Sequence, residues 1–250
     1  MSSLDSKHYL LEVRLLRDKV PSFDEFPFSL PVVHNLDTVT LHPSVTFIIG
    51  ENGAGKSTLL EAIATAWGFN AEGGSRNFHF STRSSHSNLG DYLRLVKGIR
   101  RPKDGYFLRA ESFFNVATAI EQLDEGGGGP SIIGSYGDRS LHEQSHGESF
   151  FALLMHRFRG QGLYLLDEPE AALSPTRQMA MIARMHELVE QQSQFVIATH
   201  SPILMAYPNA QILLIDATGI KPVKYTETEH FVVTRDFLNR HEKFIRELVS

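Results

Sequence analysis

A glycine-rich stretch of eight residues carries the clearest chemistry in the chain. It reads Gly50-Glu51-Asn52-Gly53-Ala54-Gly55-Lys56-Ser57 and fits the GxxxxGK[ST] pattern of phosphate-binding P-loops. Backbone N–H groups of such a loop converge on the α- and β-phosphates, while Lys56 reaches the β- and γ-phosphates and the Ser57 hydroxyl binds Mg²⁺. The helix predicted from Thr58 adds its positive end to the same anion. The residues predicted to bind phosphate are Gly50, Asn52, Gly53, Ala54, Gly55, Lys56, Ser57 and Thr58.

Two carboxylates, Asp167 and Glu168, follow the apolar run Gly162-Leu163-Tyr164-Leu165-Leu166. Such a run is typical of a strand buried on both faces of a parallel sheet, where ligands collect beyond the carboxyl ends of the strands. Asp167 is placed to hold Mg²⁺ through its water shell, and Glu168 is placed to orient and deprotonate an attacking water. An apolar run that ends in acids is a weak signal by itself, but beside a P-loop it becomes strong.

Two shorter segments have interpretations that the sequence leaves open. His200 follows an apolar strand; such a histidine is usually structural, but at this edge of a sheet it could reach a γ-phosphate. The segment SHGES at 145–149 precedes an apolar helix, where Ser145 and Glu148 form a capping box. A serine and a glycine at a helix start also suit an anion, which makes Ser145 and Gly147 candidate ligands.

Positioning these groups requires an α/β fold that brings several strand ends to one edge. Apolar runs predict buried strands, and helical periodicity predicts several helices, the last with charged pairs along its surface. The strands are expected at 46–49, 162–166, 195–198 and 212–215, and the helices at 58–67, 176–191 and 234–249. Alternation over 8–17 and a short run at 36–41 predict a small, largely antiparallel sheet before the P-loop strand.

Length and composition favour a single soluble domain. The chain has 250 residues, a formal net charge of -5 and no cysteine, so neither disulfides nor cysteine-bound metal are available. We expect one domain over 1–250, with a nucleotide-binding core at 1–70 and 160–250 and an inserted lobe at 71–159. No signal-peptide pattern opens the chain and no apolar run approaches about eighteen residues. We expect a cytoplasmic protein that would contact a membrane through a partner.

The segment 71–110 is locally basic inside this acidic chain. It contains eight lysines and arginines against the three acids Glu72, Asp91 and Asp104. Such a balance could mark a face for nucleic acid or for an acidic protein partner. The more common outcome is a solvated lobe whose charges are met by acids elsewhere in the fold.

Taken together, five ordered motifs resemble those of the ABC-type ATPases. They are GENGAGKS, SHGES, the Walker B run LYLLDEPE, a D-loop-like AALSP and THSP. The residues of these motifs resemble those of predicted AAA-type ATPases related to the SMC, DNA-repair and overcoming-lysogenization groups more than those of transporter subunits. The resemblance implies a P-loop NTPase fold with a mainly parallel central sheet flanked by helices, an N-terminal antiparallel β subdomain and an inserted, mostly helical lobe. It also implies that two protomers enclose two ATP molecules.

In that arrangement Ser145 and Gly147 would bind the γ-phosphate in trans, with the following helix, from Ser149, pointing at it. Asp167 would serve Mg²⁺, Glu168 would be the general base and His200 the γ-phosphate sensor. The chain departs from the family in its signature, QSHGES for LSGGQ, and lacks a clear Q-loop glutamine, for which Glu111 is a substitute.

We expect a Mg²⁺-dependent ATPase that homodimerises on ATP and acts on a partner or nucleic acid. One alternative is the ATP-binding subunit of a membrane transporter, and another is a nucleotide-controlled switch on DNA. Both acids are present, so ATP binding without hydrolysis fits poorly.

Overall fold

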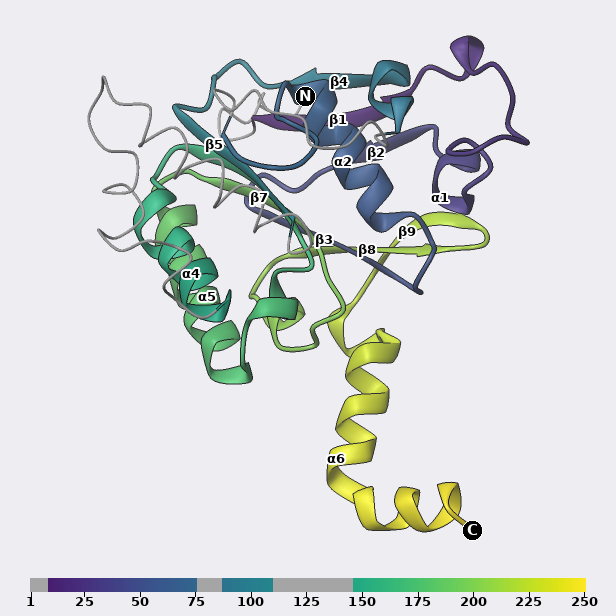
Figure 1. The fold of residues 1–250 in the computed structure, drawn as a ribbon, viewed down its shortest axis with the longest axis vertical. Helices are drawn as coiled ribbons and strands as arrows, with labels where there is room; N and C mark the ends of the chain where they lie inside the picture. The colour runs from purple at the N-terminus through teal and green to yellow at the C-terminus, as the bar shows by residue number, and fades with distance from the viewer. Residues whose placement is uncertain (1–8, 76–86, 110–145) are drawn as a thin grey trace.

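The fold is centred on a six-stranded sheet, seen in a computed structural model that describes residues 9–75, 87–109 and 146–250 (Figure 1). The strand order is β5-β6-β7-β3-β8-β9. Neighbouring strands from β5 to β8 are parallel, and β9 runs antiparallel to β8. The bounds are β3 Val45–Gly50, β5 Asp104–Arg109, β6 Gly162–Asp167, β7 Gln194–Ala198, β8 Gln211–Asp216 and β9 Gly219–Val223.

Both faces of this sheet are covered, which explains the continuous apolar runs of its strands. Successive side chains of a strand point to opposite faces, so Phe47 and Ile49 join one hydrophobic cluster while Ile48 joins the other. Every residue of β3, β6 and β7 is buried. Because the strands from β5 to β8 run parallel, their carboxyl ends all lie at one edge of the sheet, next to the loops that follow them.

A three-stranded antiparallel sheet and helix α2 cover one face (Figure 1). The small sheet has the order β2-β1-β4. Helix α2 ends at Gly68, whose φ of 104° and bonds to the carbonyls of Ala64 and Thr65 make a left-handed cap. The bounds are β1 Leu10–Leu15, β2 Thr38–Thr40, β4 Leu93–Lys97 and α2 Lys56–Trp67.

Helices α4 (His146–Ala152) and α5 (Pro175–Glu190) cover the opposite face. Helix α5 is capped by Ser174, whose hydroxyl accepts the N–H of Arg177. The chain ends with α6 (Glu229–Leu248), which extends away from the body (Figure 1) and contains no buried residue. Short helical segments complete the fold at Arg17–Lys19, Pro31–His34 (α1), Asn88–Tyr92, Leu153–Arg157, Pro169–Ala172 (η5), Leu204–Ala206 and Tyr225–Glu227 (η7).

The predicted fold class is confirmed: a mainly parallel sheet flanked by helices, with an antiparallel sheet near the N-terminus. The segment 71–159, expected as an inserted lobe, contributes a strand to each sheet, β4 to the small one and β5 to the large one. The division into core and lobe stays a prediction. Among the described residues, no helix is long and apolar enough to span a bilayer.

Candidate active site

The P-loop connects the end of β3 to the start of α2, and its glycines are there for two different reasons. A Cβ at Gly50 would lie 2.6 Å from the Ile215 carbonyl oxygen of the neighbouring strand, so a side chain does not fit. Gly55 has a φ of 94°, a left-handed conformation that side-chain-bearing residues rarely adopt. Helix α2 begins at Lys56, two residues earlier than predicted, so both Lys56 and Ser57 lie in its first turn.

The Lys56 ammonium is held against its own loop. Its Nζ donates to the carbonyls of Gly50, at 3.0 Å, and of Glu51, at 2.9 Å, and the residue is 4% exposed. Burial lowers the pKa of Lys56, and the negative charges of Glu168, Asp167 and Glu170 oppose that shift. The loop thus carries a positive charge that faces the carboxylates at the ends of the neighbouring strands.

Ser57 and Asp167 connect the P-loop to the Walker B strand. The Ser57 hydroxyl donates to Asp167 Oδ1 at 2.9 Å. Asp167 also lies 3.6 Å from Nε of Arg109, the last residue of β5, and Nη1 of Arg109 lies 2.5 Å from Glu61 Oε2 on α2. Three elements therefore meet at the carboxylate of Asp167.

This pair suits Mg²⁺, which prefers hard oxygen ligands and keeps several of its waters. A hydroxyl and a carboxylate oxygen in contact form part of such a ligand set. Within the described ranges no group of three or more His, Cys, Asp or Glu side chains could hold a metal by itself. The remaining ligands would thus be waters and phosphate oxygens, as is common where Mg²⁺ binds with a nucleotide.

Glu168 begins the turn after β6 in a strained conformation, with a φ of 50°. Its N–H donates to the Ala198 carbonyl of β7 at 2.9 Å, which fixes the backbone. Its side chain is 42% exposed, and Oε1 lies 3.9 Å from Nε2 of His200. The carboxylate is thus held at the strand edge while staying accessible to a water molecule.

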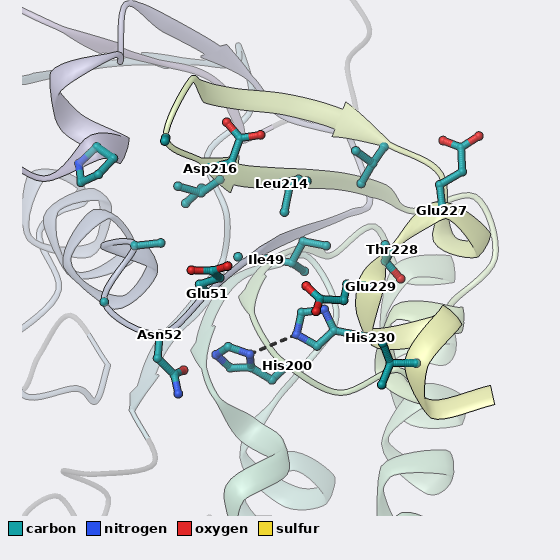
Figure 2. A pocket seen from close by; sticks show the side chains of 18 of the residues that line it. Ile49, Glu51, Asn52, His200, Leu214, Asp216, Glu227, Thr228, Glu229 and His230 are labelled. Atoms are coloured by element: carbon teal, nitrogen blue, oxygen red, sulfur yellow. Dashed lines mark hydrogen bonds between the residues drawn. The ribbon is translucent and has the colours of Figure 1, made fainter. Parts of the chain in front are cut away.

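His200 follows β7 and is oriented from two sides. Its backbone N–H donates to Glu170 Oε1 at 2.5 Å, and its Nδ1 lies 3.1 Å from Nε2 of His230 (Figure 2). Its Nε2 has no hydrogen-bond partner within the described part of the chain. Burial lowers the pKa of His200, the Lys56 charge lowers it further and Glu168 raises it, so the neutral imidazole is favoured. Burial also raises the pKa of Glu170.

A cavity of about 930 Å³ opens beside the P-loop, within the size range of small-molecule sites (Figure 2). The P-loop forms one wall, the end of β8 another, and the start of α6 a third, with His200 and His230 between them. Glu51, Asp216, Glu227 and Glu229 also line it. The cavity therefore extends from the P-loop toward α6, on the side away from β6.

The signature segment lies on α4, and only part of it can be placed. Ser145 lies outside the described residues, as does Glu111. The helix begins at His146, so Gly147 and Glu148 are inside it and not before it. A Cβ at Gly147 would lie 2.6 Å from the Ala172 carbonyl oxygen and 2.8 Å from Arg177 Nη1. Gly147 thus packs closely on the segment that follows the Walker B acids.

Several aromatic and basic residues before and after the P-loop contact other side chains of the fold. Phe28 is 2% exposed and packs edge-on against Tyr92. Lys97 lies over the Trp67 ring at 4.4 Å, and Arg109 faces Glu61 and Asp167. Within 71–110, Arg100 and Arg101 are exposed.

Three residues at this site were not predicted from the sequence. Glu170 lies in the DEPE run, so its position beside two acids was a usable signal. Arg109 is one of eight lysines and arginines in the segment 71–110, and its signal in the sequence is its position after the apolar residues Phe107 and Leu108. His230 carries no local pattern, because the contact depends on where the last helix begins.

Protein-family models match most of the described chain in succession. An AAA-domain model matches residues 26–129, and a second AAA-domain model, whose description also names the AbiEii toxin of type IV toxin–antitoxin systems, matches residues 132–206. The boundary between them falls between the P-loop and the signature segment. The P-loop and the Walker B acids are thus recognised by separate models.

The chain is also similar to curated proteins and to solved structures. The chain is 29% identical over 206 residues to the thiamine import ATP-binding protein ThiQ of Haemophilus influenzae (strain ATCC 51907 / DSM 11121 / KW20 / Rd), covering 75% of the chain and 89% of ThiQ. It is 26% identical over 190 residues to the ABC transporter G family member STR2 of Medicago truncatula, covering 68% of the chain and 25% of STR2. The chain therefore spans about a quarter of STR2.

Among solved structures, cbiO1 from Clostridium perfringens, part of the ABC transporter complex cbiONQ, has a TM-score of 0.51 and 18% identity. The match covers 97% of this chain and 100% of cbiO1. At this level of identity the likeness concerns the fold alone.

Proposed function

We propose that this chain, which matches AAA-domain models over residues 26–129 and 132–206 and has the ABC ATPase fold, hydrolyses ATP to ADP and phosphate with Mg²⁺ and homodimerises around ATP. The observation that carries the proposal is the hydrogen bond of 2.9 Å between Ser57 and Asp167. It joins the phosphate-binding loop to the strand whose next residue is the candidate base. In this proposal one site combines a phosphate loop, a pair of metal ligands and a base.

Each side chain has a proposed role in that site. Lys56 binds the β- and γ-phosphates, and Ser57 and Asp167 hold Mg²⁺, which neutralises charge on the phosphates. Glu168 accepts a proton from the attacking water, because its carboxylate is exposed and its backbone is fixed. His200 donates to the γ-phosphate through Nε2. Positioning and charge neutralisation supply most of the rate in such chemistry.

The second protomer supplies the signature in this proposal, with Ser145 and Gly147 facing the γ-phosphate of the first. Because the P-loop, Glu168 and His200 all lie at one edge of the sheet, a second copy could cover that edge as a unit.

Glu168→Gln tests the proposed base. We expect this variant to bind ATP normally, to lose at least about a hundredfold in turnover, and to accumulate as a dimer with ATP in light scattering. Glu190→Gln, at an exposed position on α5, is the matched control and should keep wild-type turnover. Wild-type turnover in Glu168→Gln would contradict the assignment. Lys56→Ala should abolish ATP binding in calorimetry.

A second candidate function is the ATP-binding subunit of a membrane transporter. The name of the relative ThiQ as a thiamine import ATP-binding protein favours it. Co-purification of the tagged chain with an integral membrane protein would support this function.

We also propose that the exposed Arg100 and Arg101 bind nucleic acid or an acidic protein. Reversing both charges should then abolish salt-sensitive DNA binding. Binding that is unchanged in this variant would remove that proposal.

A further inference from the structure

The ring of His200 contacts a second histidine that belongs to the C-terminal helix. His200 Nδ1 and His230 Nε2 are 3.1 Å apart, and the ring centroids are 5.3 Å apart (Figure 2). His230 lies in the first turn of α6 and lines the cavity beside the P-loop together with His200. The two residues are 30 positions apart in the sequence, so the contact depends on the tertiary fold.

Both imidazoles are favoured in the neutral form. Burial lowers the pKa of each; the Lys56 charge adds to this for His200, and the His200 charge adds to it for His230. A neutral imidazole has one N–H donor and one acceptor nitrogen. The contact therefore allows two arrangements, which differ in the ring that donates.

The surroundings of His200 Nε2 distinguish these arrangements. If His200 Nδ1 donated, Nε2 would carry a lone pair directed toward the Glu168 carboxylate, 3.9 Å away, and could not donate to a phosphate. If His230 Nε2 donates, the proton of His200 sits on Nε2 and faces that carboxylate favourably. His200 Nε2 has no hydrogen-bond partner within the described residues. The second arrangement leaves a donor free for an anion.

We propose that His230 is a positioning residue that fixes His200 in the tautomer with its proton on Nε2. This inference rests on the proposed function in one respect, that His200 Nε2 donates to the γ-phosphate. His230 does not touch the reacting atoms; it acts through His200, as outer hydrogen bonds orient catalytic and metal-binding imidazoles elsewhere.

The attachment of α6 explains why His230 is well placed for this role. The Thr228 hydroxyl donates to the Tyr225 carbonyl at 2.8 Å and accepts the N–H of Phe231 at 3.3 Å, which caps the helix. The Tyr225 hydroxyl donates to the carbonyl of Pro202, two residues after His200, at 2.9 Å. The start of α6 is therefore fixed to the same segment as His200.

Two variants separate the hydrogen bond from the bulk of the ring. His230→Phe keeps a ring but cannot donate, and His230→Gln keeps an N–H donor. We expect His230→Phe to lower kcat by about three- to tenfold with KM for ATP changed less than about twofold, as for loss of one hydrogen bond. His230→Gln should stay within about threefold of wild type. His241→Phe, at an exposed position on the same helix, is the matched control and should leave both constants unchanged.

The tautomer can be measured directly in the 250-residue chain by long-range ¹⁵N–¹H NMR of the histidine rings, with His200 assigned from the spectrum of His200→Gln. We expect a protonated Nε2 and an unprotonated Nδ1 in wild type, and a mixture of tautomers in His230→Phe. A protonated Nδ1 in wild type, wild-type kcat in His230→Phe, or equal losses in the Phe and Gln variants would each overturn the proposal. If the wild-type chain hydrolyses no ATP, the proposed function fails, whereas the NMR measurement still tests His230.

Discussion

Ser57 Oγ lies 2.9 Å from Asp167 Oδ1, although the two residues are 110 positions apart in the chain. The contact follows from the strand order, in which β7 lies between β3 and β6. Parallel strands bring their carboxyl ends together, so the helix that starts after β3 meets the acid that ends β6. The site is therefore a consequence of the sheet and not of a local motif.

If Ser57 and Asp167 hold Mg²⁺ as proposed, removing the Ser57 hydroxyl should weaken Mg²⁺ binding without removing the loop. We expect Ser57→Ala to raise the Mg²⁺ concentration that gives half-maximal ATPase activity at least about tenfold, because an oxygen ligand is lost. Ser57→Thr keeps the hydroxyl and fits the P-loop pattern, so it should stay near wild type. A magnesium titration of turnover measures both variants. Identical curves for the Ala and Thr variants would contradict the role of the hydroxyl.

Arg109 should contribute to stability as well as to the site. Its side chain is 19% exposed and faces Glu61 and Asp167, whose side chains are 9% and 7% exposed. Arg109→Ala removes one partner of a buried ion pair, so we expect a loss of about 3 kcal/mol in the free energy of unfolding, or roughly 6–12 °C in Tm. Arg101→Ala, at an exposed position, should change stability by less than about 0.5 kcal/mol. Equal Tm values for the two variants would contradict the ion pair's importance.

Gly147 should not tolerate a methyl group. The added Cβ of Gly147→Ala would lie 2.6 Å from the backbone oxygen of Ala172, and backbone cannot move aside as a flexible side chain can. We expect α4 to shift and the free energy of unfolding to fall by about 1–3 kcal/mol. Denaturant unfolding measures this, with Glu148→Ala, at an exposed neighbouring position, as control. Wild-type stability in Gly147→Ala would show that α4 does not pack on Ala172 in solution.

The histidine pair predicts that stability falls on the acid side of neutrality. Both His200 and His230 have a pKa below the ordinary value of 6.5 in the folded protein. Below about pH 6.5 the unfolded chain therefore binds more protons than the folded chain. Their contribution is fully present above pH 6.5 and is lost as the pH falls through the folded pKa values.

We expect the pH dependence of the free energy of unfolding to be smaller in His230→Gln, by up to about one proton. Denaturant unfolding between pH 7.5 and 5.5 would measure it. The difference between the two curves isolates the pair from Glu170, whose raised pKa acts with the opposite sign. Parallel curves for wild type and variant would contradict the lowered pKa of His230.

The strands and the acids at their ends could be predicted from the sequence, because each depends on a local pattern of residues. The runs at 46–49 and 162–166 became buried strands, and Asp167 ended one of them. Side-chain orientation was harder to predict. Met179 is apolar and lies on α5 but is 56% exposed, because the buried face of this helix passes through Met181 and Met185.

Contacts between distant elements could not be predicted. Nothing near His230 indicates that the first turn of a C-terminal helix returns to the end of β7. The basic residues of 71–110 also looked alike in the sequence, yet Arg109 faces acids while Arg100 and Arg101 are exposed. Such differences follow from the sheet order and from the loops, which no short pattern specifies.

Helix α6 has no buried residue, and its opening turn holds His230. A protein that binds this helix and displaces that turn would separate the imidazoles of His200 and His230. By the proposal above, this separation would lower kcat while the affinity for ATP stays nearly unchanged. A protein bound to α6 could accordingly slow turnover without competing with ATP.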